Sequence, residues 1–492
     1  MPTSSAAKPR DIPAIVILAA GLVLTLAVRL YRIADFGLWQ DEVFSLRVAR
    51  LSWAEMFGQV IADVVHPPLF YTLLKLWIAV GGESLVWLRL LPILFALLTL
   101  WPLYLLCREL SASLLEYAIA VVVISLNSFL ILYAREVRMY SMLTFFSVLS
   151  MWMFARFVRD ESDPKRHLVW LFFINLALFH THYFGAMTIA AEFCALIALQ
   201  RKKLLPFVLQ TVVVAVCFIP WLWTVAAAAS QKGGLSQNVG WIERPGLGAI
   251  PQLLGEFQGE AIFPRATTVG ILIFLVPILL WLWKVVKSRD KNAVLTIAVL
   301  GLSTVVPIVL TFLLSSVAGA SAWVDRYMIA AAIPYLLLAV VAASRQSNVV
   351  LLYVFLPLLV TWSLAIGTWN LVHQHSRVDW IAVSSTIGTR PSSPVFVTEP
   401  WAEMPVTEAL HRSSRPDVKV TTVTRPSQIA DSEFWFIYRS SKWADSVPAE
   451  TNLTNRACVV DMNDVQHLTG DDLHLLHVSC GPTSGVVSLS IR

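Results

Sequence analysis

Long apolar runs separated by short polar turns fill the first 370 residues of the chain. Most of these runs approach the ~20 residues that an α-helix needs to cross a bilayer. The first run has no small-residue cleavage site behind it, so we interpret it as a retained anchor and not a signal peptide. The pattern predicts eleven membrane-spanning helices, at 12–32, 85–107, 113–132, 139–158, 167–183, 185–200, 204–227, 267–286, 292–315, 326–343 and 349–370.

One apolar segment, 67–80, is shorter than a bilayer requires. We predict that it forms an interfacial helix lying on the outer membrane surface. The alternative is that it crosses the membrane and turns inside at Gly81 and Gly82. That arrangement would invert every later loop and place the basic turns outside.

Clusters of Lys and Arg lie between the apolar runs and set the predicted orientation, because cytoplasmic loops carry an excess of basic residues. The clusters contain Lys8 and Arg10, Arg108, residues 156–166, 201–203 and 284–291, and Arg345. With these clusters inside, the end of the chain is outside. We therefore expect a multi-pass protein of the cytoplasmic (inner) membrane with an extracytoplasmic C-terminal part.

After residue 370 the chain becomes polar, with short β-rich runs between Pro, Ser and Asp turns. The runs are PVFVT, VKVTTV, EFWFIY, ACVVDM and LHLLHVSC. We predict a transmembrane domain at 1–370, with outer loops at 33–84 and 228–266, and a soluble extracytoplasmic α/β domain at 371–492. Cys458 and Cys480 lie in the second domain, where an oxidising compartment permits a disulfide, although free thiols fit the sequence equally well.

The amino-acid composition agrees with a multi-pass membrane protein. The chain is 57% hydrophobic and only 14% charged, with a mean hydropathy of +0.68. A soluble globular protein is far less apolar. The net charge of +5 follows from the topology clusters, so no nucleic-acid partner is expected. The predicted fold class is an all-α polytopic membrane protein with a small soluble α/β domain.

The chemically interesting groups gather in the predicted outer loops. An adjacent carboxylate pair, Asp41 and Glu42, follows the first span, and charge at such a junction is costly unless it is solvated or functional. Most basic residues there are Arg, whose planar fork suits phosphate oxygens. The outer surface therefore resembles an anion-binding surface. Its other polar residues are His66, Arg135, Glu136, Arg138, His180, His182, Arg265, Asp325 and Arg326.

Signatures of bound nucleotide and metal are missing from the sequence. It holds no Gly-rich phosphate loop, no dinucleotide fingerprint and no D-x-D motif. His180 and His182 are one residue apart, a spacing that places them on different faces of a helix. We predict no cofactor, and metal binding is unsupported.

Several motifs together resemble a known family. They are LWQDEVFSL with the acidic pair, HPPLFY, the run ESLVWLRLLPILFALLTLWPLYLLCREL, YAREVRMYSML and THYFG. The combination is similar to the GT-C fold membrane glycosyltransferases, in the superfamily of protein O-mannosyltransferases and aminoarabinose transferases. The resemblance covers residues 12–200 well and the later spans loosely, through DRYM at 325–328.

The resemblance implies a transferase that moves a hexose or pentose from a polyprenyl-phosphate donor to an acceptor hydroxyl on the outer side of the membrane, with inversion. It implies Asp41 as general base and Glu42 as the group that orients the acceptor or the neighbouring loop. The acceptor is a glycan, a lipid or a protein, and the β-trefoil insert of the protein O-mannosyltransferases is absent. The remaining candidates are Arg135, Arg138, Arg326, His66 and Tyr140 for the donor phosphate, and His182, Arg265 and Asp325 for substrate.

Each assignment has a structural alternative. Asp41 suits the N-cap of a helix that begins near Val43. Arg135 and Arg138 are three residues apart, so on a shared helical face they would only snorkel or pair with neighbours. His66 fits the end of a loop before two prolines. Asp325 and Arg326 fit an interfacial ion pair.

Two other functions remain open at this point. A lipid or solute transporter also has many spans, but it should show paired helix breaks and charges at mid-membrane depth. A noncatalytic envelope-assembly protein would keep the fold without the chemistry.

Overall fold

The structure is a computed structural model, which describes residues 12–231, 240–259, 264–317, 321–373, 378–389, 393–423, 429, 431–439, 458–460, 466–468 and 473–480. The chain forms two compact units. The first contains Met1–Tyr31, Val48–Glu83 and Trp87–His373. The second contains Arg32–Arg47, Ser84–Val86 and Gln374–Arg492. The short segments 32–47 and 84–86 thus group with the C-terminal residues, although they lie between spans in the sequence.

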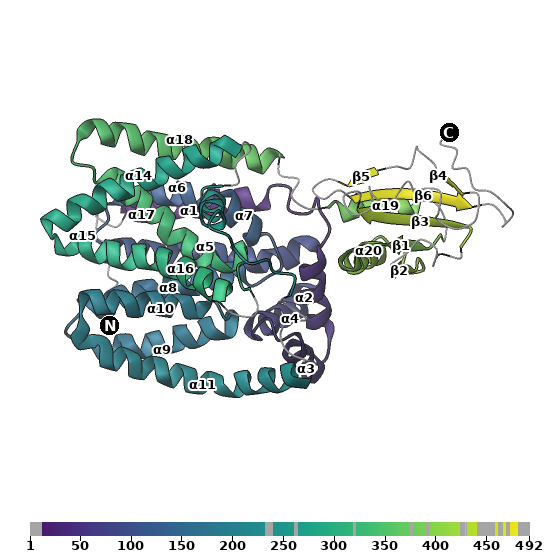
Figure 1. Cartoon of the computed structure of the whole chain (residues 1–492), viewed down its shortest axis with the longest axis horizontal. Helices are drawn as coiled ribbons and strands as arrows, with labels where there is room; N and C mark the ends of the chain where they lie inside the picture. Colours follow the sequence, from purple (N-terminus) through teal and green to yellow (C-terminus); the bar gives the residue numbers. More distant parts are fainter. Residues whose placement is uncertain are drawn as a thin grey trace, which may run out of the picture. The chain divides into compact units, whose positions relative to one another are not determined.

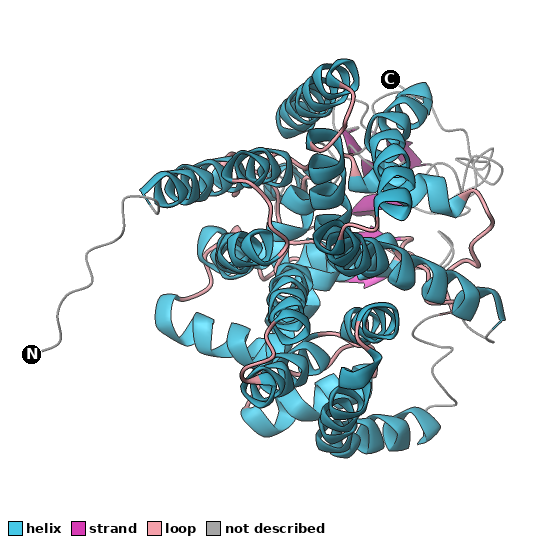
Figure 2. Cartoon of the chain, turned by 90° about the vertical axis from the view of Figure 1, so that its left-hand side faces the viewer, coloured by secondary structure: helices cyan, strands magenta, loops and turns pink. Residues whose placement is uncertain are grey.

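The first unit is a bundle of helices, many of which are seen end-on in Figure 2. Its helices are α1 (Ile12–Leu30), α3 (Trp53–Asp63), α4 (Leu69–Gly81), α5 (Leu85–Glu109), α6 (Leu114–Ser125), α7 (Ser128–Ala134), α8 (Tyr140–Arg159), α9 (Pro164–Thr181), α10 (Gly185–Leu199), α11 (Leu204–Gln231), α13 (Ala249–Phe257), α14 (Pro264–Ser288), α15 (Lys291–Thr296), α16 (Leu302–Val317), the 3₁₀ segment η3 (Asp325–Ala331), α17 (Ala332–Ser344) and α18 (Val349–His373) (Figure 1). Helix α2 (Gln40–Arg50) begins in the second unit.

Every predicted span coincides with helix. Among the described residues, 7 helices are long and apolar enough to cross a membrane, and 8 if the bent pair α6 and α7 counts as one span. The other three predicted spans correspond to α1, α9 and α10. The total of eleven crossings stays a prediction.

The predicted span 113–132 consists of two helices and not one straight helix, so its crossing as a single span stays a prediction. Helices α6 and α7 meet at an angle of 63°. The break follows from Asn127, whose side-chain oxygen accepts a hydrogen bond from the Leu130 N–H at 3.0 Å and so starts a new helix. Its amide nitrogen donates to the Phe257 carbonyl at 2.9 Å. The bend turns the chain toward the loop that carries Arg135 and Arg138.

Burial separates central helices from peripheral ones. The segment Asp325–Ser344 is 94% buried, and α8 packs against α9 and α10. In contrast, the spans that contain α11 and α18 are only 17% and 11% buried. Their exposed side chains are large and apolar, such as Trp223 and Tyr353. An apolar surface of this extent is stable in lipid and not in water, in agreement with an integral membrane protein.

The short segment predicted at 67–80 forms α4, of 13 residues. It ends in a tight turn at Gly82, whose φ of 78° favours glycine. A Cβ on Gly81 would lie 2.0 Å from the Trp87 ring, so glycine is required there as well. Trp77 stacks on Trp87 with ring centroids 4.4 Å apart, and the two indoles donate to each other's carbonyls. The position of α4 at the membrane surface stays a prediction.

The second unit is α/β. Strand β1 (Val395–Val397) pairs in parallel with β2 (Val420–Thr422) and β3 (Glu433–Arg439). Strand β6 (Leu473–Cys480) pairs antiparallel with β3, β4 (Cys458–Val460) and β5 (Gln466–Leu468). Helices α19 (Trp380–Gly388) and α20 (Pro400–Arg412) complete the unit. The predicted strand runs are confirmed, and β5 was not predicted.

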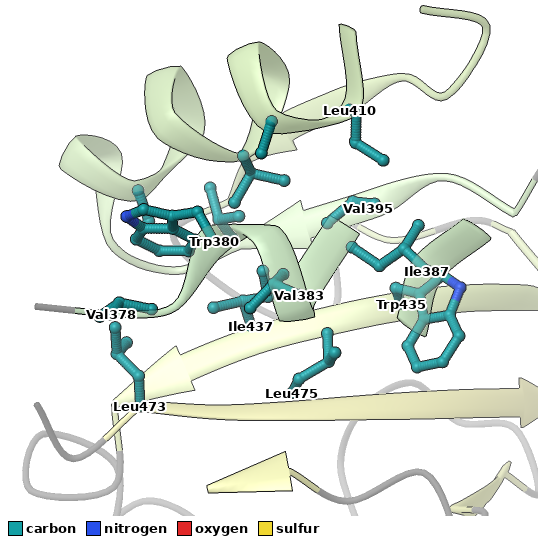
Figure 3. Close-up of a cluster of buried hydrophobic side chains, with 14 of the residues drawn as sticks. Val378, Trp380, Val383, Ile387, Val395, Leu410, Trp435, Ile437, Leu473 and Leu475 are labelled. Atoms are coloured by element: carbon teal, nitrogen blue, oxygen red, sulfur yellow. The ribbon is translucent and has the colours of Figure 1, made fainter. Parts of the chain in front are cut away.

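Alternation along the strands builds two apolar layers. Trp435 and Ile437 of β3 pack with Val395 and with Trp380 of α19 (Figure 3). The intervening Phe434 and Phe436 belong to a second cluster with Phe396 and Val478. This alternation is what a strand with side chains on both faces produces.

A disulfide and a close glycine contact also hold the second unit together. Cys480 is disulfide-bonded and lies directly opposite Cys458 in the β4–β6 ladder, so the open question of free thiols is answered for Cys480. Gly37 lies so close to α19 that a Cβ would be 2.9 Å from the Trp380 Cβ. This contact joins segment 32–47 to the second unit.

Candidate active site

Four polar residues of the first unit come from places where helices begin or end. His66 lies between α3 and α4, a link made by the left-handed Val64 (φ 59°) and two prolines. Arg138 lies in the gap between α7 and α8. His182 follows the last residue of α9, and Arg326 lies in the first turn of η3. Helix ends leave backbone groups unpaired and side chains free to converge, so they are natural places for a polar site.

We call His66, Arg138, His182 and Arg326 the arginine cluster. Arg138 is the first of its two arginines. Its side chain is 2% exposed. Nη2 lies 3.3 Å from His66 Nδ1 and 3.2 Å from Nε2, and Nη1 donates to the Tyr71 hydroxyl at 3.4 Å. The Asp63 carboxylate lies 3.5 Å from His66 Nδ1. The guanidinium is therefore held by aromatic neighbours in a nearly dry environment.

Arg326 is the second charge. Its Nε donates to the Tyr140 hydroxyl at 3.0 Å. The guanidinium carbon lies 5.7 Å from the ring centres of both Trp241 and Tyr327. Contacts of this kind stabilise a cation over an aromatic face. They fix the orientation of the guanidinium.

His182 connects the two arginines. Its ring centre is 5.4 Å from that of His66, 5.0 Å from Tyr327 and 6.2 Å from Tyr140. Nδ1 accepts the Phe184 N–H at 3.1 Å, which assigns the ring proton to Nε2 in the neutral form. In the part of the chain that is described, Nε2 has no hydrogen-bond partner. The ring therefore offers a buried donor for an oxygen of a ligand.

Burial lowers the pKa of His182 well below its usual 6.5, and the charges of His66, Arg138 and Arg326 lower it further. As the pH falls, His182 is therefore protonated in the unfolded chain before it is protonated in the native state. The native state loses stability below about pH 6.5. We expect the melting temperature in detergent to drop between pH 7.5 and 5.0, and to drop less in His182→Gln. His180→Gln is the matched control and should behave like the wild type. Equal drops in wild type and His182→Gln would contradict this.

The acidic pair lies at the start of α2. Because α2 begins at Gln40, Asp41 is not its N-cap, and that alternative is wrong. Instead the Glu42 carboxylate accepts the Trp39 N–H at 3.1 Å, reaching back to the residue before the helix. Glu42 is 1% exposed, whereas Asp41 is half-buried. Glu42 thus fixes the start of the helix that carries Asp41.

Asp41 and Glu42 belong to the second compact unit, and the arginine cluster belongs to the first. Each unit is described by itself. The roles of Asp41 and Glu42 toward the cluster therefore stay a proposal.

The structure places the remaining candidate site residues, Arg135, Asp325 and Arg265, as follows. Arg135 donates to the Tyr31 carbonyl at 2.6 Å, beyond the end of α1. It does not share a helical face with Arg138, because residues 135–139 are not helical. The charges of the neighbours Asp325 and Arg326 interact, and Arg326 also donates to the Tyr140 hydroxyl, so the ion-pair alternative stays open. The side chain of Arg265 lies outside the described residues.

The sequence analysis did not assign roles to Tyr71, Asp63 and Tyr327. Tyr71 lies in HPPLFY and Tyr327 in DRYM, so the motifs contained the signal. Trp241 lies in the predicted outer loop 228–266 and was not assigned a role either, and the structure places it against Arg326. No group of three His, Cys, Asp or Glu suited to a metal occurs among the described residues.

Residues 65–223 match the family described as dolichyl-phosphate-mannose-protein mannosyltransferase. No curated protein matches the sequence. The fold is similar to that of ArnT from Cupriavidus metallidurans in the apo state, with 12% identity over 96% of this chain and 98% of that chain and a TM-score of 0.56.

Two further similar structures contain lipid phosphates. ArnT from Cupriavidus metallidurans bound to undecaprenyl phosphate has 13% identity, covers 98% of this chain and 100% of that chain, and has a TM-score of 0.53. Archaeal AglB from Archaeoglobus fulgidus, in complex with an inhibitory peptide and a dolichol-phosphate, has 13% identity, 82% and 64% coverage, and a TM-score of 0.51.

The protein is thus a multi-pass integral membrane protein, as its apolar helices and lipid-facing surfaces require. The chain has the fold of these structures, the GT-C fold that the resemblance of its motifs predicted.

Proposed function

We propose that the protein transfers a sugar from a polyprenyl-phosphate donor to an acceptor hydroxyl, at the outer surface of the inner membrane. The observation that carries this proposal is the cluster of two arginines around a neutral histidine. The planar guanidinium groups of Arg138 and Arg326 suit phosphate oxygens, and His182 adds a neutral donor beside them. A lipid-linked phosphate would bring such oxygens to a membrane surface. The undecaprenyl phosphate and dolichol-phosphate of the similar structures support this choice of ligand.

In this proposal the cluster binds the donor phosphate. Arg138 and Arg326 form charge-assisted hydrogen bonds to its oxygens, and His182 donates from Nε2. The negative charge on the leaving lipid phosphate increases as its bond to the sugar breaks. Donors already in position stabilise that charge more in the transition state than in the ground state.

Asp41 is the proposed general base. The acceptor oxygen forms a bond to the anomeric carbon while the bond from that carbon to the phosphate oxygen breaks. The hydroxyl proton moves to the Asp41 carboxylate, and the polyprenyl phosphate leaves with the bonding electron pair. Attack opposite the leaving group inverts the anomeric configuration. Glu42 holds the loop, and Arg135, His66, Tyr140, Asp325 and Arg265 complete the proposed site.

The C-terminal domain at 371–492 is proposed to face the outside and to bind the acceptor, which is a glycan, a lipid or a protein. Its two-layer α/β structure has its own apolar core.

Transfer from a defined donor tests the function. The protein in lipid vesicles is incubated with labelled polyprenyl-phosphate hexoses and pentoses and an envelope extract of the source cells. We expect labelled product and free polyprenyl phosphate in a ratio of one to one. Sugar nucleotides should not replace the lipid donor. Absence of transfer from every lipid donor, or transfer from a sugar nucleotide alone, would refute the proposal.

Trp241→Ala should weaken the use of donor, because Arg326 loses one of the two rings that orient it. A cation–π contact contributes about 0.5–2 kcal/mol, which corresponds to a rise in the donor KM of roughly 2- to 30-fold. The control is Trp223→Ala, since Trp223 is exposed on α11. An unchanged donor KM in Trp241→Ala would show that the contact has no role in binding.

A further inference from the structure

A third arginine, Arg29, lies buried at the end of α1 with no part in the site above. It is 2% exposed. Nη1 donates to the carbonyls of Thr25 at 3.4 Å and Ser125 at 3.2 Å. Both acceptors are neutral, and no carboxylate pairs with Arg29 among the described ion pairs. A buried cation without a counter-charge is strongly disfavoured.

A cavity of about 20 Å³ lies against this side chain. Its polar lining comes from three helices: Thr25 and Arg29 of α1, Thr99 of α5, and Ser141 and Thr144 of α8. Arg29 Nε is buried and has no hydrogen-bond partner in the described part of the chain. Ser141 Oγ is only weakly engaged, at 3.5 Å from the Tyr133 carbonyl. The cavity therefore contains an unused charged donor and a hydroxyl that can turn inward.

The size of the cavity limits what it can hold. A single water needs roughly 10–15 Å³, so about 20 Å³ admits a water-sized species and excludes a phosphate or a sugar. Water would satisfy Nε but would leave the charge uncompensated. A small monovalent anion satisfies both requirements.

We propose that this cavity is a halide site, in which chloride binds between Arg29 Nε and the hydroxyl of Ser141, while the hydroxyls of Thr99 and Thr144 donate to backbone carbonyls of their own helices. The ion would be the counter-charge of Arg29. The cavity lies next to the elements that carry the arginine cluster. Ser141 and Thr144 follow Tyr140 in α8, and Ile329, which lines the cavity, lies in the η3 segment that carries Arg326. Chloride would thus stabilise the helix ends that present the arginine cluster.

Ligand-dependent stability tests this inference without reference to activity. The purified full chain is melted in detergent in sodium chloride, sodium bromide or sodium gluconate at equal ionic strength. A bound ion stabilises the native state in proportion to ln(1 + [L]/Kd). We expect a saturable rise of the melting temperature in chloride and bromide over gluconate, which is too large for the cavity.

Variants and diffraction separate a specific ion from a general salt effect. Arg29→Gln and the cavity-filling Thr99→Leu should both lose the halide dependence, whereas Arg156→Gln should keep it. Crystals of the wild type in bromide should show an anomalous peak beside Arg29 Nε. Equal melting in halide and gluconate, halide dependence retained in Arg29→Gln, or a cavity holding only water would overturn the proposal. The bromide experiment needs only wild-type protein, so it decides the question even if a variant does not fold.

Discussion

Asp41→Asn is expected to lower kcat for sugar transfer by about 10²- to 10⁴-fold, the usual contribution of a general base. The amide has the same shape as the carboxylate, but it cannot accept the acceptor proton. Asp41 is the second residue of α2, and Glu42 caps the start of this helix, so the substitution should leave the fold intact. Donor affinity should stay unchanged, because the base does not bind the phosphate.

Asp35→Asn is the matched control. Asp35 lies in the segment just before α2, but it is exposed and pairs with Arg32 at 2.5 Å. Exposed pairs contribute little, so this variant should retain transfer. Wild-type turnover in Asp41→Asn would exclude Asp41 as the base, and equal losses in both variants would indicate a general effect on the loop.

Arg138→Gln should weaken binding of polyprenyl phosphate by roughly 10- to 150-fold. The reason is the loss of a charge-assisted hydrogen bond, which contributes about 1.5–3 kcal/mol. The side chain is 2% exposed, so water cannot replace it easily. Titration of detergent-solubilised protein with polyprenyl phosphate, followed by intrinsic tryptophan fluorescence, measures this effect.

Two further variants qualify the result. Arg138→Lys keeps the charge without the planar fork and should give an intermediate affinity. Arg156→Gln removes an arginine from the other end of α8, where it pairs with Glu109 at 3.6 Å, and should bind normally. If Arg138→Gln bound the lipid as tightly as the wild type, the phosphate would have to bind elsewhere.

The positions of the helices could be predicted because apolar runs of bilayer length permit few other structures. Local interactions were harder to predict. Asn127 ends one helix and starts the next within an apolar run, and a single polar residue does not change the hydropathy pattern. The helix was expected to begin near Val43, but α2 begins at Gln40. The sequence does not reveal the hydrogen bond from the Trp39 N–H to the Glu42 carboxylate, which caps this earlier start.

The candidate residues of the site could be found from residue type and position, but their contacts could not. The motifs selected His66, Arg138, Tyr140, His182 and Arg326. The hydrogen bond from Arg326 to Tyr140 and the ring contact from His182 to Tyr327 join residues far apart in the sequence. Such contacts depend on how the helices pack, which hydropathy does not encode. Arg29 was overlooked because an arginine near the end of a span is usually interpreted as snorkelling.

The most direct test of the account is an experimental structure of the protein with bound polyprenyl phosphate. We predict the phosphate within hydrogen-bond distance, about 3 Å, of Arg138 and Arg326. We also predict that Asp41 lies on the same side of the membrane and faces that pocket. A phosphate bound away from both arginines, or Asp41 at the opposite membrane surface, would contradict the proposed site.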